Sequence, residues 1–153
     1  MLCHFTVVIP EFTSSGLLPP GIHWADWPNV VKRFGTNVHR QRHLSGLDRG
    51  LKVLQKAGCP VAYLNGSFVT DKEFPSDYDV CYETAGVTLS MLDPVFHEFT
   101  NRCAAQKAKY RGEFRPAYVC AEGPPLFRRF FNFFQIDKDT GDPKGIIGLK
   151  LIT

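Results

Sequence analysis

The sequence predicts an α/β or α+β domain in which helices flank a small mixed β-sheet. Its 153 residues suit a single hydrophobic core. Residues 36–57 carry apolar side chains spaced three and four apart, as in an amphipathic helix. Short apolar runs of β-branched and aromatic residues follow at 60–64 and 78–82. Helical and strand patterns are therefore mixed along the chain, which favours helices packed on one small sheet.

The first 35 residues are expected to form an arm that packs on a single domain at residues 36–153. Residues 2–9 contain a short apolar run and predict an edge strand. Asp26 suits the N-cap of a short helix that has proline in its first turn and ends at Gly35. The arm is thus expected to contribute one strand and one helix.

A longer helix is expected to run to about Ala57. Thr36 or Asn37 can cap its first turn, and Gly58 suits the position that closes it. One face is marked as buried by leucines at helical spacing: Leu44, Leu47, Leu51 and Leu54.

The rest of the chain is expected to alternate between helices, strands and turns. Residues 88–110 predict two helices that break near Thr100 and Asn101. The phenylalanines of residues 127–134 share a helical face, so we expect an amphipathic helix there that belongs to the core. Strands are expected at 60–64, 78–82, 114–119 and 146–152, with a turn at 137–145.

Composition and charge limit the class of protein. Hydrophobic residues make up 44% and charged residues 22% of the chain, which excludes a disordered tail protein and a coiled coil. The net charge of +3 permits a phosphate-bearing partner without requiring one. Five cysteines with no CxxC pair favour reduced thiols. With no signal peptide and no long apolar stretch, we expect a cytoplasmic protein without a membrane partner.

Two acidic residues open the second of the β runs. Asp77 and Asp79 are two positions apart, and positions i and i+2 of a strand project from the same face. Tyr78 is then expected to point the other way, into the core. Two carboxylates held this close repel each other unless a cation lies between them. Mg²⁺, which prefers carboxylate and phosphate oxygens, suits this pair.

The preceding β run ends in a glycine and a serine, Gly66 and Ser67. Glycine lets the backbone approach a phosphate closely, while backbone amides and the serine hydroxyl donate hydrogen bonds to it. Lys72, in the loop that follows, is placed to reach a phosphate of the same ligand. The segment therefore predicts a phosphate cradle at Gly66, Ser67 and Lys72, beside the acidic pair.

An apolar strand, Gly-Ser, about ten residues and then Asp-x-Asp between apolar residues resembles the signature of the DNA polymerase β-like nucleotidyltransferase superfamily. The resemblance covers residues 61–82. The length of the chain is similar to that of the minimal nucleotidyltransferases of bacteria and archaea, some of which act in toxin–antitoxin pairs. The resemblance implies a mixed sheet flanked by helices, a nucleoside triphosphate substrate and two Mg²⁺ ions. The segment from Gln135 to Ile146 is also similar to small bacterial proteins assigned to that fold.

The superfamily usually has a third carboxylate on a later strand. Glu113 is the first choice, because an acidic residue beside apolar ones opens a β run there; Asp137 is the second choice and lies at a turn. The resemblance implies that Asp77, Asp79 and Glu113 bind the metal ions and catalyse the reaction. A nucleoside monophosphate would then pass from the triphosphate to a hydroxyl of an RNA, a protein or a small molecule.

Other classes of function stay open. A non-catalytic protein on the same scaffold, such as an RNA-binding or antitoxin-like partner of another protein, would explain the less certain third acid. A metal-dependent phosphohydrolase that uses the same aspartates ranks lower. His39 and His43 have the i and i+4 spacing of metal ligands but lack a HExxH motif, so we expect them on a solvated face. An exposed basic face is expected at Arg102, Lys107, Lys109 and Arg111, which would contact triphosphate or RNA if it were functional.

Overall fold

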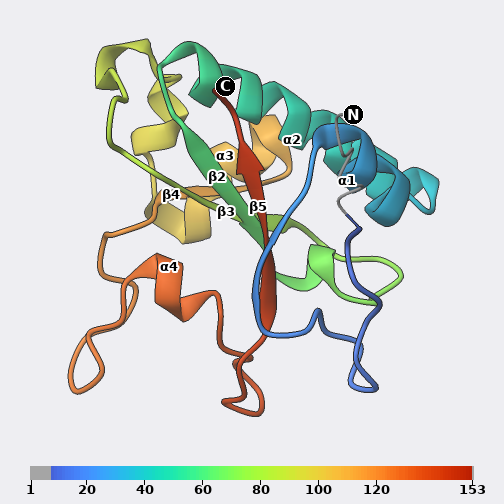
Figure 1. Ribbon diagram of the computed structural model, residues 1–153. Helices are drawn as coiled ribbons and strands as arrows, with labels where there is room; N and C mark the ends of the chain where they lie inside the picture. The colour runs from blue at the N-terminus through green and yellow to red at the C-terminus, as the bar shows by residue number, and fades with distance from the viewer. Residues whose placement is uncertain (1–7, 153) are drawn as a thin grey trace, which may run out of the picture.

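The computed structural model describes residues 8–152. These residues form a five-stranded mixed sheet with four α-helices, so the predicted α+β class is confirmed (Figure 1). The helices are α1 (Trp27–Phe34), α2 (Val38–Lys56), α3 (Thr100–Tyr110) and α4 (Phe130–Phe133). The strands are β1 (Gly21–Trp24), β2 (Val61–Asn65), β3 (Tyr78–Tyr82), β4 (Gly112–Pro116) and β5 (Gly145–Lys150).

The strand order across the sheet is β1-β5-β2-β3-β4. The outer pairs, β1 with β5 and β3 with β4, are parallel, and the two inner pairs are antiparallel. Figure 1 shows the blue segment that contains β1 running alongside the red strand β5. Local sequence patterns did not predict β1; the strand expected at 2–9 lies mostly outside the described residues. Of residues 8–152, no helix is both long and apolar enough to cross a membrane.

One face of the sheet packs on α1 and α2 and forms the main core. The predicted leucine stripe of α2 is buried there, and the predicted caps Asp26 and Asn37 accept hydrogen bonds from backbone amides at the starts of α1 and α2. α2 approaches β4 so closely that a Cβ at Gly50 would lie 2.2 Å from the ring of Phe114. Glycine therefore stands inside this helix because no larger residue fits.

The opposite face carries a smaller apolar cluster, which is covered by the chain from Ala117 to Phe134. The core helix expected at residues 127–134 is wrong in extent, since α4 has only four residues. Phe134 is buried, but Phe127 is 62% exposed. The reason is the isolated bridge between Cys120 and Arg129, which makes the residues between them a loop that leaves the sheet.

The region from 88 to 110 also differs from its prediction. Its first half forms two short 3₁₀ turns, Leu89–Met91 and Pro94–His97, in place of a helix. Asp93 caps the second of these turns by accepting a hydrogen bond from Val95 N. The break expected near Thr100 falls at the start of α3, where residues 101–103 have positive φ. α3 then leads directly into β4, which begins two residues before the predicted strand.

Candidate functional site

A row of polar residues crosses three neighbouring strands on the face of the sheet opposite α1 and α2. The register pairs Asn65 of β2 with Asp79 of β3, and Asp79 with Glu113 of β4. Directly paired residues project from the same face. Asp77 comes two residues before Asp79, whereas Tyr78 is fully buried in the main core and donates its hydroxyl to a backbone carbonyl. The structure thus sends the tyrosine to one side of the sheet and gathers the acids on the other.

An open cleft of ≈ 1590 Å³ borders this row. Its volume exceeds the roughly 300–1,000 Å³ of a typical small-molecule pocket, so it has room for two reactants. The cleft brings together every site residue that the sequence predicted: Gly66, Ser67, Lys72, Asp77, Asp79 and Glu113. Asp137 also borders it.

The phosphate cradle and the acidic pair are in direct contact. Gly66 has φ +83°, a conformation that favours glycine, and a Cβ at this position would lie 2.2 Å from Asp79 Oδ2. The Asp79 carboxylate therefore packs against the Gly66 backbone. Ser67 follows and begins a short 3₁₀ turn, Ser67–Val69. A ligand that touches the Gly66 backbone is within reach of the Asp79 oxygens.

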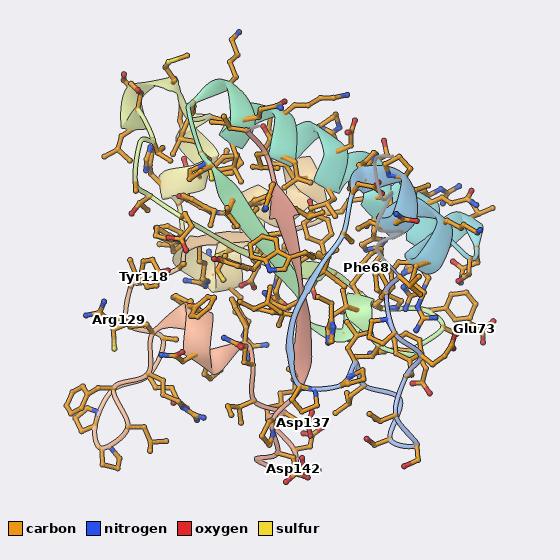
Figure 2. All side chains as sticks on the ribbon, viewed as in Figure 1. Phe68, Glu73, Tyr118, Arg129, Asp137 and Asp142 are labelled. Carbon is orange, nitrogen blue, oxygen red and sulfur yellow. The ribbon has the colours of Figure 1, made fainter. Side chains whose placement is uncertain are left out.

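The two candidates for the third acid occupy different surroundings. Glu113 shares a cation with Asp77, because Lys107 Nζ lies 3.0 Å from Glu113 Oε1 and 3.3 Å from Asp77 Oδ2. Asp137 instead accepts hydrogen bonds from the amide and hydroxyl of Thr140, which lower the pKa of its carboxyl. Figure 2 shows Asp137 beside Asp142 at the tip of the loop that precedes β5. The geometry joins Glu113, and not Asp137, to the aspartate pair.

The charges in the cleft are strongly coupled. Burial and the charges of Glu113 and Asp77 raise the pKa of Asp79 to about 7. Burial opposes the charge on Lys107, but hydrogen bonds to Glu113 and Asp77 raise its pKa overall. Burial lowers the pKa of Lys144, although the charges of Asp137 and Asp79 act in the opposite direction. The site therefore combines crowded carboxylates with two lysines that partly neutralise them.

Lys144 has no predicted site role, and Lys107 is expected from the sequence on an exposed face. That expectation is wrong for Lys107, whose ammonium turns into the cleft and pairs with two acids. Arg102 also borders the cleft, whereas Lys109 pairs with Asp93. The signal that identifies Lys107 is its position on α3, the helix that leads directly into β4; only the parallel pairing of β3 with β4 brings the acids to it.

The solvated face expected for His39 and His43 is also wrong in part. His43 is 2% exposed, and its ring nitrogens lie 2.9 Å from the carbonyl oxygens of His39 and Ser76. His39 Nε2 lies 2.5 Å from the carbonyl oxygen of Pro75. The loop before Asp77 folds over this end of α2, buries His43 and partly covers His39.

The oxygen donors of the cleft fit a hard divalent cation in their chemistry. Asp77, Asp79 and Glu113 supply carboxylates from the cleft lining. Behind them Asn65, the partner of Asp79 in the sheet, has a buried Oδ1 without a hydrogen-bond partner among the described residues. Burial and the charges of Glu113 and Asp77 raise the pKa of Asp79, and a cation would relieve the repulsion among these carboxylates. As the side chains stand, no three His, Cys, Asp or Glu residues within 8–152 are close enough to hold a metal ion. The Lys107 ammonium lies between Asp77 and Glu113, where a metal ion would otherwise neutralise them.

Comparisons with known proteins add a family but no activity. No curated protein matches the chain, and no solved structure matches it. Residues 10–150 match a family model described as a family of unknown function, DUF6932. Because this match spans nearly the whole chain, the protein belongs to the DUF6932 family.

Proposed function

We propose that the protein is a Mg²⁺-dependent nucleotidyltransferase, which transfers a nucleoside monophosphate from a nucleoside triphosphate to a hydroxyl of an RNA, a protein or a small molecule. The observation that carries the proposal is the contact between Gly66 and Asp79. It puts a backbone suited to phosphate next to carboxylates suited to the metal of a metal–triphosphate complex. The volume of the cleft supports the presence of a second reactant.

Each residue of the cleft has a role in this reaction. Backbone amides near Gly66 and the Ser67 hydroxyl would donate hydrogen bonds to the triphosphate, and Lys72 would offset its charge. Asp77 and Asp79 would hold Mg²⁺, which when bound supplies charge neutralisation and lowers the pKa of a nearby hydroxyl. Glu113 would orient the acceptor hydroxyl and accept its proton. The acceptor oxygen then bonds to the α-phosphorus as the bond to the leaving pyrophosphate breaks.

The first test is nucleotide binding. ATP, GTP, CTP and UTP, each with Mg²⁺, are compared by thermal unfolding, and at least one is expected to raise Tm. Binding at 100 times Kd corresponds to about 2.7 kcal/mol, or roughly 5–10 °C for a domain of this size. The chelator EDTA is expected to abolish the increase, because the triphosphate reaches the carboxylates through the metal. An equal increase with EDTA, or none with any nucleotide, would contradict the proposal.

A second prediction concerns Lys107. Without metal, Lys107→Met leaves Asp77 and Glu113 without their shared cation, and we expect it to lower stability by about 1 kcal/mol. Millimolar Mg²⁺ is expected to restore this loss, so the variant gains more in Tm from Mg²⁺ than the wild type does. Lys109→Met is the matched control, since Lys109 lies on the same helix and pairs with Asp93 outside the cleft. Equal gains from Mg²⁺ in both variants would show that Lys107 and the metal do not share a position.

The position of Lys107 also favours a second candidate, a non-catalytic binding protein on the same scaffold. Its ammonium joins Asp77 to Glu113 and neutralises them without a metal. Such a protein would bind RNA or neutralise a partner protein, as an antitoxin does. It would show no Mg²⁺-dependent nucleotide effect on Tm, and Lys107→Met would be destabilised with and without Mg²⁺. The two preceding experiments therefore separate the candidates.

A further inference from the structure

The loop that joins the phosphate cradle to the acidic pair is held by one end of α2. Residues 67–76 contain only the 3₁₀ turn Ser67–Val69, yet they connect Gly66 to Asp77. Four side chains from the start of α2 bind backbone carbonyls of this loop. The donors are Asn37, His39, Arg40 and His43, and the acceptors are the carbonyls of Phe68, Thr70, Lys72, Glu73, Pro75 and Ser76. Figure 2 shows Phe68 and Glu73 on the side of the molecule where α2 begins.

Arg40 makes the largest share of these contacts. Its guanidinium donates to the carbonyls of Phe68 at 2.8 Å, Thr70 at 3.0 Å and Lys72 at 2.5 Å. A further bond of 3.2 Å reaches Phe34 O at the end of α1, and the guanidinium stands 4.9 Å from the centre of the Phe68 ring. One planar group therefore fixes three alternate residues of the loop against two helices.

This arrangement is unusual for a buried cation. Arg40 is 3% exposed, and within the described part of the chain no carboxylate forms an ion pair with it. A buried charge is costly unless hydrogen bonds compensate it, and here only backbone carbonyls do so. If this residue served only to fill the core, an apolar side chain of similar volume would be sufficient. What Arg40 adds is a fixed path for the residues between Ser67 and Lys72, both of which border the cleft.

We propose that Arg40 is a positioning residue of the candidate site: through the carbonyls of Phe68, Thr70 and Lys72 it fixes the path of the loop, and so holds Ser67 and Lys72 in place beside the Asp77–Asp79 pair. The proposal rests on the proposed function. Arginine is required because its planar fork donates several hydrogen bonds in fixed directions, whereas a lysine ammonium is a single point on a flexible chain. Charge alone does not replace it.

The test compares Arg40→Lys and Arg40→Met with Arg49→Met. Arg49 is an exposed basic residue of the same helix that donates to one carbonyl, Lys109 O, outside the loop. Hydrogen exchange of the metal-free protein is measured for residues 67–76 and for the sheet. In both Arg40 variants we expect exchange in the loop to rise at least about tenfold while the sheet stays protected, and Arg49→Met to exchange as the wild type does. Loop protection equal to that of the wild type in a folded Arg40 variant would overturn the proposal.

Kinetics with Mg²⁺ and ATP, or whichever triphosphate the wild type uses, test whether Arg40 affects the reaction. A misplaced loop displaces the groups that would hold the triphosphate and so misaligns its α-phosphorus, and kcat/KM is expected to fall about 100-fold in Arg40→Met, with a higher KM and a lower kcat. Arg40→Lys is expected to recover only part of this loss. A variant that merely unfolds in part would lower kcat in proportion to the folded fraction and leave KM unchanged, which would overturn the assignment. If the wild type transfers no nucleotide, the proposed function fails, whereas the exchange measurement still judges the role of Arg40 in the loop.

Discussion

Replacing both Asp77 and Asp79 with asparagine is expected to abolish transfer of label from an α-labelled nucleoside triphosphate. Asparagine keeps the size of the side chain and removes the charge that would hold the metal. Loss of a single group that stabilises developing charge commonly costs about 100- to 1,000-fold in rate, so the double variant should fall by at least about a thousandfold. The measurement is label transfer to total RNA and to lysate proteins, with circular dichroism to verify that the fold is unchanged.

Two further variants give this experiment its controls. Glu113→Gln is expected to lose activity as well, because glutamine cannot accept the proton of the acceptor hydroxyl. Asp137→Asn is expected to remain active, since Asp137 is engaged in its own turn by Thr140. Transfer that survives in the double variant would remove the acidic pair from the site. Loss of activity in Asp137→Asn with full activity in Glu113→Gln would instead identify Asp137 as the third acid.

In the metal-free protein, Asp79→Asn is expected to be more stable than the wild type at pH 8. The pKa of Asp79 is about 7 in the folded protein against 3.8 for the ordinary side chain. Between pH 3.8 and pH 7 the folded state therefore keeps a proton on Asp79 that the unfolded chain releases. The stability that this proton provides is complete below pH 3.8 and is lost as the pH rises through 7. The difference in pKa corresponds to about 4 kcal/mol lost by the wild type, and asparagine, which does not titrate, loses none of it.

Urea unfolding at pH 5 and pH 8, with EDTA present, measures the part of this effect that falls above pH 5, about 2.7 kcal/mol. The free energy of unfolding of Asp79→Asn minus that of the wild type is expected to increase between the two pH values. Asp137→Asn is the matched control, because hydrogen bonds from Thr140 lower the pKa of Asp137 and its charge favours the folded state. That variant should gain nothing at pH 8. A constant difference between Asp79→Asn and the wild type would mean that Asp79 is not held among uncompensated charges.

Local patterns predicted those parts of the fold that depend on neighbouring residues. The caps Asp26 and Asn37 act on amides three residues away, and the leucines of α2 share a face through helical periodicity. The direction of Asp77 and Asp79 followed from the two-residue period of a strand. The class of fold was confirmed for the same reason, since it depends only on which local elements are present.

The parts that the sequence did not predict depend on residues far apart in the chain. β1 is a strand because β5, more than 100 residues later, pairs with it in parallel. Lys107 enters the cleft because α3 leads into β4 and β4 pairs with β3. Arg40 and His43 are buried only because a loop about 30 residues downstream folds over them. For Lys107, Arg40 and His43 the local pattern, a basic or polar residue on a helix, equally suits the surface.

The position of β5 has a consequence for how the protein matures on the ribosome. This strand is formed by residues 145–150 and lies between β1 and β2. Until β5 leaves the exit tunnel, β1 has no strand partner among residues 8–152, and one edge of β2 is open to other chains. Lys144, which borders the cleft, emerges with it. The nascent polypeptide therefore cannot join β1 to the rest of the sheet, or bring Lys144 to the cleft, before residues 144–150 have left the tunnel.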